Sequence, residues 1–214
     1  MPVFEANLIA IIDYGVGNLR SVQKAFEKVG HTAVVTSNPK EIDDAKAVVL
    51  PGVGAFAKCM ANLNEYGLVD SIYKTIEKGK PFLGICLGMQ LLFTEGEEFG
   101  IHKGLDIIKG KVKRFPDGMK ADEAILKIPH MGWNNLIIKK APPLLQDVAD
   151  SPFVYFVHSY YCAPEDKNII AASAEYGIEF TAMLWKDNIY ATQFHPEKSQ
   201  EIGLKMLQRF GELS

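Results

Sequence analysis

Apolar residues follow two different spacings along the first part of this chain, up to Phe93. Four short runs of apolar or β-branched residues have the length of buried strands: Leu8–Ile12, Thr32–Thr36, Ala47–Leu50 and Pro81–Ile85. Between and after these runs, apolar residues recur at spacings of three and four, which predicts helices over 19–29, 56–63, 68–78 and 87–92. Strands that alternate with helices favour a parallel sheet covered by helices on both faces.

The pattern changes after Phe93. Thr94–His102 is acidic and contains glycine, and it is predicted to be a loop. Short strands are expected beyond it, at 110–115, 135–138, 153–157, 169–174, 180–185 and 189–194, followed by a last helix over 200–210. We therefore expect an α/β fold, a three-layer sandwich with a central, mostly parallel, mixed sheet, formed by residues 1–214 as a single domain.

Composition and charge exclude several classes of protein. The 214 residues are 48% hydrophobic and 23% charged, with a formal net charge of −3, which gives no electrostatic footprint for nucleic acid. No signal peptide and no apolar run of membrane-spanning length is visible. The three cysteines lack the spacing of a disulfide framework, and the five scattered histidines form no metal-binding pattern. We expect a cytoplasmic protein without metal or cofactor.

The stretch Lys80–Gln90, KPFLGICLGMQ, carries the first candidate chemistry. Cys86 lies between a predicted strand and a predicted helix, framed by Gly84 and Gly88. This is the spacing of a nucleophile elbow with a thiol in place of a serine hydroxyl. The backbone N–H of Leu87 and the helix N-terminus face the same point, where they can stabilise an oxyanion. The alternative is a buried structural cysteine between two unrelated glycines.

A thiol nucleophile needs a base, and the base needs a group that orients it. The C-terminal stretch YATQFHPEKS offers His195 and Glu197, two residues apart. We expect Pro196 to end a strand there, so that extended backbone directs both side chains the same way. The alternative is an ordinary surface turn. Cys86, His195 and Glu197 together predict a catalytic triad.

A second loop is expected beside the elbow. The strand 47–50 runs directly into Pro51-Gly52-Val53-Gly54. Its two glycines permit backbone conformations that turn an N–H group toward a reacting carbonyl, so Val53 and Gly54 are predicted to contribute to an oxyanion hole. The alternative is a tight connection between strand and helix. Gly15 and Gly17 also follow a strand, but the third glycine of a dinucleotide-binding turn is absent.

Together, GICLGMQ and QFHPEKS resemble the triad-type (class I) glutamine amidotransferases, Cys-His-Glu glutaminases that release ammonia for a partner synthase. Further stretches are similar to the glutaminase subunits of imidazole glycerol phosphate synthase: DYGVGNLRS, PGVGAF, HMGWN and YFVHSY. The resemblance runs from about Asp13 to Phe210. It implies a flavodoxin-like fold, L-glutamine as substrate, and a heterodimer with a (β/α)8 cyclase that makes imidazole glycerol phosphate and aminoimidazole carboxamide ribotide in histidine biosynthesis.

The same resemblance implies residues of the glutamine pocket. Gly52, Gln90, Ser159 and Tyr160 are expected along it, and Glu98 is expected to bind the α-amino group. His130 and His158 lack a carboxylate two residues on, so we favour structural or interface roles for both.

The face that binds the partner is predicted from neighbouring residues. Asn18 follows a glycine turn at the carboxyl end of a strand, Lys198 adjoins Glu197, and Trp133 is a large aromatic residue in a Gly- and Asn-rich stretch. The alternative is that Trp133 belongs to the core and Lys198 is merely solvated. Two rival functions also stay open: the glutaminase of a different synthase, for example one that aminates a sugar, or a non-catalytic binding partner of the same fold.

Overall fold

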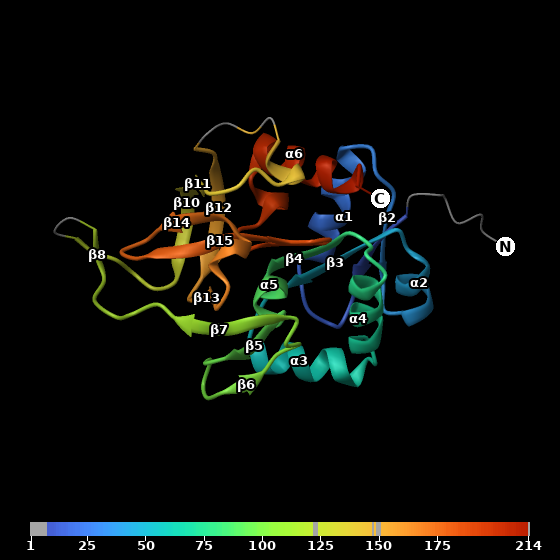
Figure 1. Cartoon of the computed structure of the whole chain (residues 1–214), viewed down its shortest axis with the longest axis horizontal. Helices are drawn as coiled ribbons and strands as arrows, with labels where there is room; N and C mark the ends of the chain where they lie inside the picture. Colours follow the sequence, from blue (N-terminus) through green and yellow to red (C-terminus); the bar gives the residue numbers. More distant parts are fainter. Residues whose placement is uncertain (1–7, 122–123, 147, 149–150, 214) are drawn as a thin grey trace.

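A computed structural model describes residues 8–121, 124–146, 148 and 151–213 (Figure 1). The first half of the sheet is parallel, in the order β2-β1-β3-β4-β16. Its strands are β1 (Ile9–Ile12), β2 (Ala33–Thr36), β3 (Ala47–Gly52), β4 (Phe82–Cys86) and β16 (Ile189–Thr192). Because they are parallel, their carboxyl ends meet at one edge, where α/β proteins place their sites.

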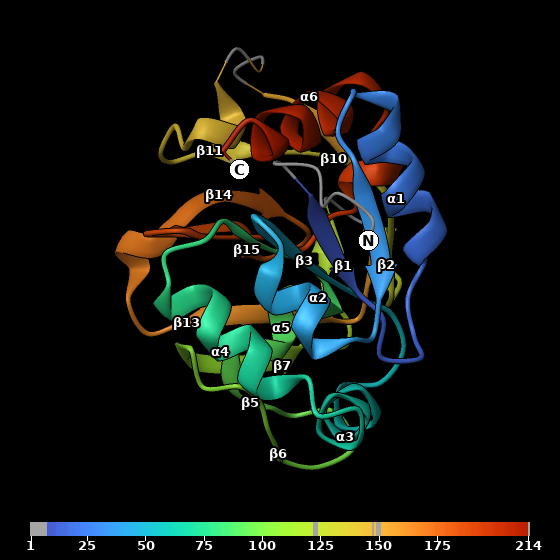
Figure 2. The same ribbon diagram turned by 90° about the vertical axis from the view of Figure 1, so that its right-hand side faces the viewer.

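Alternation along these strands sends side chains to two separate cores. In β1, Ile9 and Ile11 belong to one core, whereas Ala10 and Ile12 belong to the other. The first core is covered by α1 (Leu19–Lys28) and α6 (Gln200–Gly211), and the second by α2 (Pro39–Asp44), α3 (Phe56–Glu65), α4 (Val69–Glu77) and α5 (Leu87–Leu91). Figure 2 shows the resulting helix–sheet–helix layers, so the predicted three-layer α/β fold is confirmed.

The sheet continues beyond β16 with mostly antiparallel pairing, in the order β15-β13-β7-β5-β6, with β14 and β11 branching from β15. These strands are β5 (Phe93–Gly96), β6 (His102–Lys103), β7 (Ile108–Arg114), β11 (Ile137–Ile138), β13 (Tyr160–Pro164), β14 (Ile170–Glu175) and β15 (Glu179–Lys186). A separate pair joins β10 (His130–Asn135) to β12 (Phe153–His158), and another joins β8 (Lys120–Ala121) to β9 (Ala124–Ile125). No helix among the described residues is long and apolar enough to span a membrane.

Two predicted elements differ from the structure. The expected loop Thr94–His102 is shorter than predicted: its first residues belong to β5 and its last to β6, because Phe93 is buried and β5 pairs with β7 despite its polar residues. The expected strand 135–138 is divided between β10 and β11, which pair with different partners. The short helix α2 begins at Pro39 and is capped by Asn38, whose side chain accepts the Lys40 N–H.

Another strand was not anticipated from the pattern. β13 follows β12 after one residue, Ser159, and it pairs with β7 along its whole length. Cys162 is buried on β13, while its neighbours are partly exposed. The strand therefore alternates, but it is short and follows β12 after a single residue.

Gly88 fixes the close packing of α5 against β3. A Cβ atom on Gly88 would lie only 1.8 Å from the backbone oxygen of Leu50. Because this oxygen belongs to the backbone of a central strand, it cannot rotate away as a side chain would. Only glycine therefore allows the helix to begin directly at the end of β4.

We predict that Gly88→Ala lowers the free energy of unfolding by about 3 kcal/mol or more, because the overlap is with rigid backbone. Gly67→Ala is the control: Gly67 has a φ of +67° but open space around it. Gly67→Ala should lower the free energy of unfolding by only about 1–2 kcal/mol, the cost of placing a Cβ atom in a left-handed backbone conformation. Urea unfolding measures both, and equal losses would contradict the packing role of Gly88.

Candidate active site

Cys86 has the geometry of a nucleophile elbow. It is the last residue of β4 and directly precedes α5, with φ 54° and ψ −109°. A positive φ is unfavourable for a residue with a Cβ atom, and such strain concentrates at functional sites. Gly84 and Gly88 make the turn possible, because a Cβ atom on either would come within 3.0 Å of backbone atoms. The predicted strand–turn–helix arrangement around Cys86 is therefore present.

The Cys86 side chain opens into a cavity of about 400 Å³, which is within the usual size of small-molecule sites. Most predicted site residues line it: Val53, Gly54, Cys86, Leu87, Gln90, Glu98, Ser159, Tyr160, His195 and Lys198. Pro129, Val157 and His158 also line it, although no sequence pattern predicted a role for them there. Gly52, Glu197, Asn18 and Trp133 lie outside this lining.

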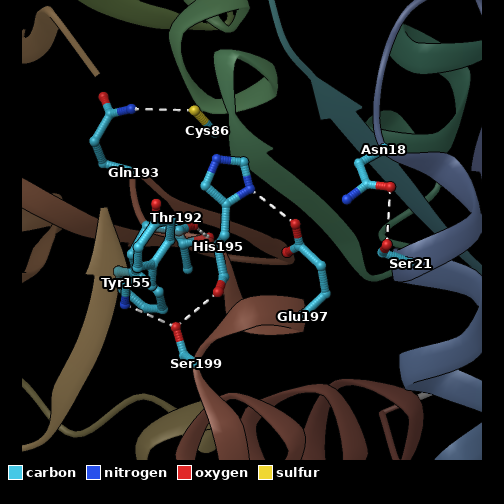
Figure 3. Close-up of polar contacts among 10 residues, drawn as sticks. Asn18, Ser21, Cys86, Tyr155, Thr192, Gln193, His195, Glu197 and Ser199 are labelled. Carbon is cyan, nitrogen blue, oxygen red and sulfur yellow. Dashed lines mark hydrogen bonds and ion pairs between the residues drawn. The ribbon is translucent and has the colours of Figure 1, made fainter. Parts of the chain in front are cut away.

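His195 and Glu197 form a buried pair behind Cys86. The Nδ1 atom of His195 lies 2.8 Å from a carboxylate oxygen of Glu197, and both side chains are almost completely buried. Figure 3 shows the imidazole between Cys86 and Glu197, with Nδ1 toward the carboxylate. Nε2 is buried without a hydrogen-bond partner among the described residues, so it is free to interact with the thiol and a substrate.

The backbone around this pair differs from the expectation. Extended backbone through Pro196 was predicted, but β16 ends at Thr192 and residues Pro196–Lys198 form a 3-10 turn. Proline suits the first position of such a turn, because its fixed φ and missing N–H cost nothing there. The turn folds the Glu197 carboxylate back toward His195.

Ser199, which the sequence patterns did not single out, fastens this turn to β12. Its hydroxyl accepts the N–H of Tyr155 at 3.0 Å and donates to the carbonyl of His195 at 2.7 Å. Tyr155 in turn accepts the His195 N–H through its carbonyl, at 3.0 Å. The backbone of His195 is therefore held on both sides (Figure 3).

Two opposing effects determine the charge of His195. Burial alone would lower its pKa, but Cys86 and Glu197 next to the ring favour the imidazolium and raise the pKa to about 10. The proton on the ring can come from the Cys86 thiol, which leaves a thiolate beside an imidazolium. Such a pair is the activated form of a cysteine nucleophile.

The Pro51–Gly54 loop lies next to the elbow, since Gly52 pairs with Cys86 across β3 and β4. Gly54 has a φ of +98°, which glycine adopts without strain. Tyr14 holds the loop by donating from its hydroxyl to the Pro51 carbonyl at 2.8 Å, and a Cβ atom on Gly52 would meet this hydroxyl at 2.5 Å. Gly52 thus has a packing role, while Val53 and Gly54 face the cavity.

The other two cysteines, Cys59 and Cys162, are small buried residues, and neither forms a disulfide. Burial raises the pKa of the Cys59 thiol to about 11 and that of Cys162 well above its ordinary value. Neither has a histidine partner among the hydrogen bonds of the described residues. Among these residues, no cluster of His, Cys, Asp or Glu side chains has metal-site geometry.

Two of the polar residues expected to bind substrate, Glu98 and Gln90, already have protein partners. One carboxylate oxygen of Glu98 accepts the N–H of Phe56, at the start of α3, at 2.6 Å. Gln90 donates from Nε2 to the Tyr160 carbonyl and to the side chain of Gln193, which sequence reasoning did not identify. These bonds fix both side chains on the cavity wall.

The three predicted partner-binding residues lie in different settings. Lys198 lines the cavity and lies over the ring of Tyr155, with Nζ 5.9 Å from the ring centroid. Trp133 is 44% exposed and packs against the same ring, at a centroid distance of 6.0 Å. Asn18 precedes α1 and accepts the Ser21 hydroxyl, on another segment (Figure 3).

Comparisons with known proteins agree with this geometry. The family model of glutamine amidotransferase class-I matches residues 10–212. The fold is similar to PurLQS from Thermotoga maritima, with a TM-score of 0.73, 18% identity and coverage of 95% of this chain and 96% of that one. It is also similar to a GMP synthase subunit from Thermoplasma acidophilum, with a TM-score of 0.69, 19% identity and coverage of 96% and 92%. The chain belongs to the class-I glutamine amidotransferase family.

Closer relatives narrow this assignment within the family. An imidazole glycerol phosphate synthase subunit HisH from Geobacter sulfurreducens is 60% identical over 205 residues, 96% of this chain and 98% of the relative. The HisH subunit from Caldanaerobacter subterraneus is 52% identical over 206 residues, 96% of this chain and 98% of the relative. The chain therefore falls among the HisH subunits of imidazole glycerol phosphate synthase.

The charge assignments can be tested by NMR of the histidine rings. We predict that His195 stays protonated at pH 8 and loses its proton only as the pH rises toward about 10. Because this pKa lies above the unfolded value of 6.5, the ring contributes stability below pH 6.5 that is lost as the pH rises through about 10. Glu197→Gln should lower the pKa of His195. A His195 ring that titrates near 6.5 in the native chain would contradict the pair.

Proposed function

We propose that this chain hydrolyses the side-chain amide of L-glutamine to glutamate and ammonia. The observation that carries the proposal is the single cavity that joins the strained Cys86 elbow, the buried His195–Glu197 pair and the Val53–Gly54 loop. These are the parts that acyl transfer through a thioester needs: a nucleophile, a base held by a carboxylate, and nearby backbone donors.

The first half of the reaction forms a thioester. The Cys86 thiolate attacks the carboxamide carbon, and the carbonyl oxygen becomes an oxyanion. The backbone N–H of Leu87, together with the Val53-Gly54 segment, stabilises this oxyanion. His195 Nε2 then gives its proton to the nitrogen as the C–N bond breaks, so that ammonia leaves and a glutamyl thioester remains on Cys86.

The second half restores the enzyme. Water attacks the thioester carbon and gives a proton to His195, which is neutral after the first step. The C–S bond breaks, glutamate leaves, and the thiolate–imidazolium pair forms again. Glu197 keeps the ring in one tautomer and stabilises its charged form throughout. Gln90, Glu98, Ser159 and Tyr160 are positioned to orient the glutamine molecule, with Gly52 supporting the loop.

The relatives name the synthase that would use the ammonia. By likeness to HisH subunits, we propose that the chain forms a heterodimer with a (β/α)8 cyclase that makes imidazole glycerol phosphate in histidine biosynthesis. The exposed Trp133 side chain and the Tyr155 ring form a continuous surface with Lys198, which reaches the cavity. A partner seated on this surface would cover the cavity mouth. Asn18 is proposed as a further contact.

We predict that Cys86→Ala abolishes glutamine hydrolysis in the complex, with unchanged fold and partner binding, because neither of the other two thiols has a histidine partner. The matched control is Cys162→Ala, which removes a buried thiol from β13 and should keep activity within a few fold. Glutamate release in the presence of the cyclase measures both variants. Hydrolysis by Cys86→Ala at the rate of the unmodified chain would refute the triad.

The partner surface is tested by truncating its exposed aromatic residue. Trp133→Ala should weaken cyclase binding by about 2 kcal/mol, or about 30-fold in Kd, because tryptophan is a frequent interface hot spot. Tyr73→Ala is the control, since Tyr73 is similarly exposed at 37% but belongs to α4, away from the surface that Trp133 forms with Tyr155 and Lys198. Isothermal titration calorimetry compares the two. Unchanged affinity for Trp133→Ala would remove this residue from the interface.

A further inference from the structure

Gln193 contacts the sulfur of Cys86 inside the protein. It lies between the end of β16 and His195, its side chain is completely buried, and its backbone N–H donates to the Ala182 carbonyl at 2.8 Å. The amide nitrogen Nε2 lies 3.7 Å from Cys86 Sγ, which is within hydrogen-bond range for sulfur (Figure 3). The reaction steps above make no use of this group.

A chain of hydrogen bonds determines which end of the Gln193 amide faces the sulfur. The Tyr160 carbonyl can only accept, so the group that faces it at 3.2 Å must be the NH₂ of Gln90. The same NH₂ lies 3.1 Å from the Gln193 side chain, which must therefore present its oxygen there. The NH₂ group of Gln193 is left to point at Cys86.

The Tyr160 carbonyl is itself fixed by a pair of histidines. His158 Nδ1 lies 2.8 Å from this carbonyl and must donate to it, so its Nε2 accepts from His130 Nδ1 at 3.0 Å. His130 Nε2 then accepts from the Asn134 side chain at 3.3 Å. Every bond in the chain from Asn134 to Tyr160 has one possible direction, provided that both rings are neutral.

The surroundings keep these rings neutral. His130 is stacked between Tyr176 and Phe156, with centroid distances of 4.1 Å and 4.8 Å. Burial lowers the pKa of His130 to about 4, and burial also lowers that of His158 to about 3. Structural or interface roles were expected for the pair, and it supports the Tyr160 carbonyl to which Gln90 donates.

We infer that Gln193 is a positioning residue that donates a hydrogen bond to Cys86 Sγ and stabilises the thiolate for attack. An N–H group aimed at sulfur favours the charged form of the nucleophile over the thiol. It also holds the sulfur in place from a buried position, without itself lining the substrate cavity. The Tyr160 carbonyl fixes the direction of this bond through Gln90, and His158, backed by His130, holds that carbonyl in place.

Other ionisable groups surround Cys86 and set the background against which Gln193 acts. They are His195, with Glu197 behind it, the buried Tyr14 and Cys162 on neighbouring segments, and Glu98, His158, Tyr160 and Lys198 on the cavity wall. Substitution of Gln193 leaves all of these in place, so a change in thiolate reactivity reports on the amide itself.

The test is the rate of Cys86 alkylation by iodoacetamide as a function of pH, followed by mass spectrometry of the peptide that contains Cys86. Gln193→Met keeps the length of the side chain but removes the donor. At pH values below the midpoint of the native alkylation profile, alkylation should slow about tenfold, the equivalent of one pKa unit, and it should recover at more alkaline pH. Gln193→Glu replaces the amide NH₂ with an oxygen and places a carboxylate beside the sulfur, so it should slow alkylation further.

Ser173→Ala is the control, because it removes a buried hydroxyl from β14, outside the lining of the Cys86 cavity, and should leave the profile unchanged. Superimposable profiles for the native chain and both Gln193 variants would overturn the inference. If the Gln193 variants do not fold, the same alkylation profile is measured for Gln90→Met, because this substitution removes the donor that orients the Gln193 amide and leaves that amide free to rotate. An alkylation profile that is shifted to higher pH in Gln90→Met supports the inference, and an unchanged profile overturns it.

This inference rests on the proposed nucleophile, but the two fail separately. If Cys86→Ala still hydrolysed glutamine, the proposed function would be wrong whatever the alkylation profile. An unchanged profile in the Gln193 variants would remove only the role of Gln193 and leave the triad as proposed.

Discussion

Cys86 is held at a φ of 54° between two glycines that allow backbone to approach within van der Waals contact. Strain of this kind costs about 1–3 kcal/mol and persists only where the surrounding structure imposes it. Here it is imposed by α5, which begins at Leu87 and packs through Gly88 on the backbone of β3. The projection of the thiol into the cavity, and its distance from every other site residue, depend on this turn.

The remaining parts of the site come from distant segments that the sheet topology brings to one edge. The Val53-Gly54 segment follows β3, Cys86 ends β4, and the His195–Glu197 pair follows β16, all at carboxyl ends of adjacent parallel strands. Tyr155 on β12 and Ser199 hold the backbone of His195 in place through hydrogen bonds. The buried carboxylate of Glu197, together with Cys86, then outweighs the burial that would otherwise keep His195 neutral.

Sequence patterns predicted what depends on local spacing. The alternation of apolar runs and helical spacings was enough for the parallel half of the sheet, and the elbow glycines were enough to place Cys86. The patterns failed for segments whose local structure depends on partners distant in the sequence. β5 is polar but forms because β7 pairs with it, and the turn at Pro196 replaces extended backbone because Ser199 bonds to β12. Gln193 was overlooked, since only the folded chain shows that its amide meets the Cys86 sulfur.

We propose that Cys86 is the activated thiol of a glutamine-specific site. The most direct measurement of this is covalent labelling with a chloroketone analogue of L-glutamine, followed by mass spectrometry of the three cysteine-containing peptides. Only Cys86 should be modified, and L-glutamine should slow the modification. Labelling of Cys59 or Cys162 instead, or labelling of Cys86 at a rate that glutamine does not change, would contradict this proposal.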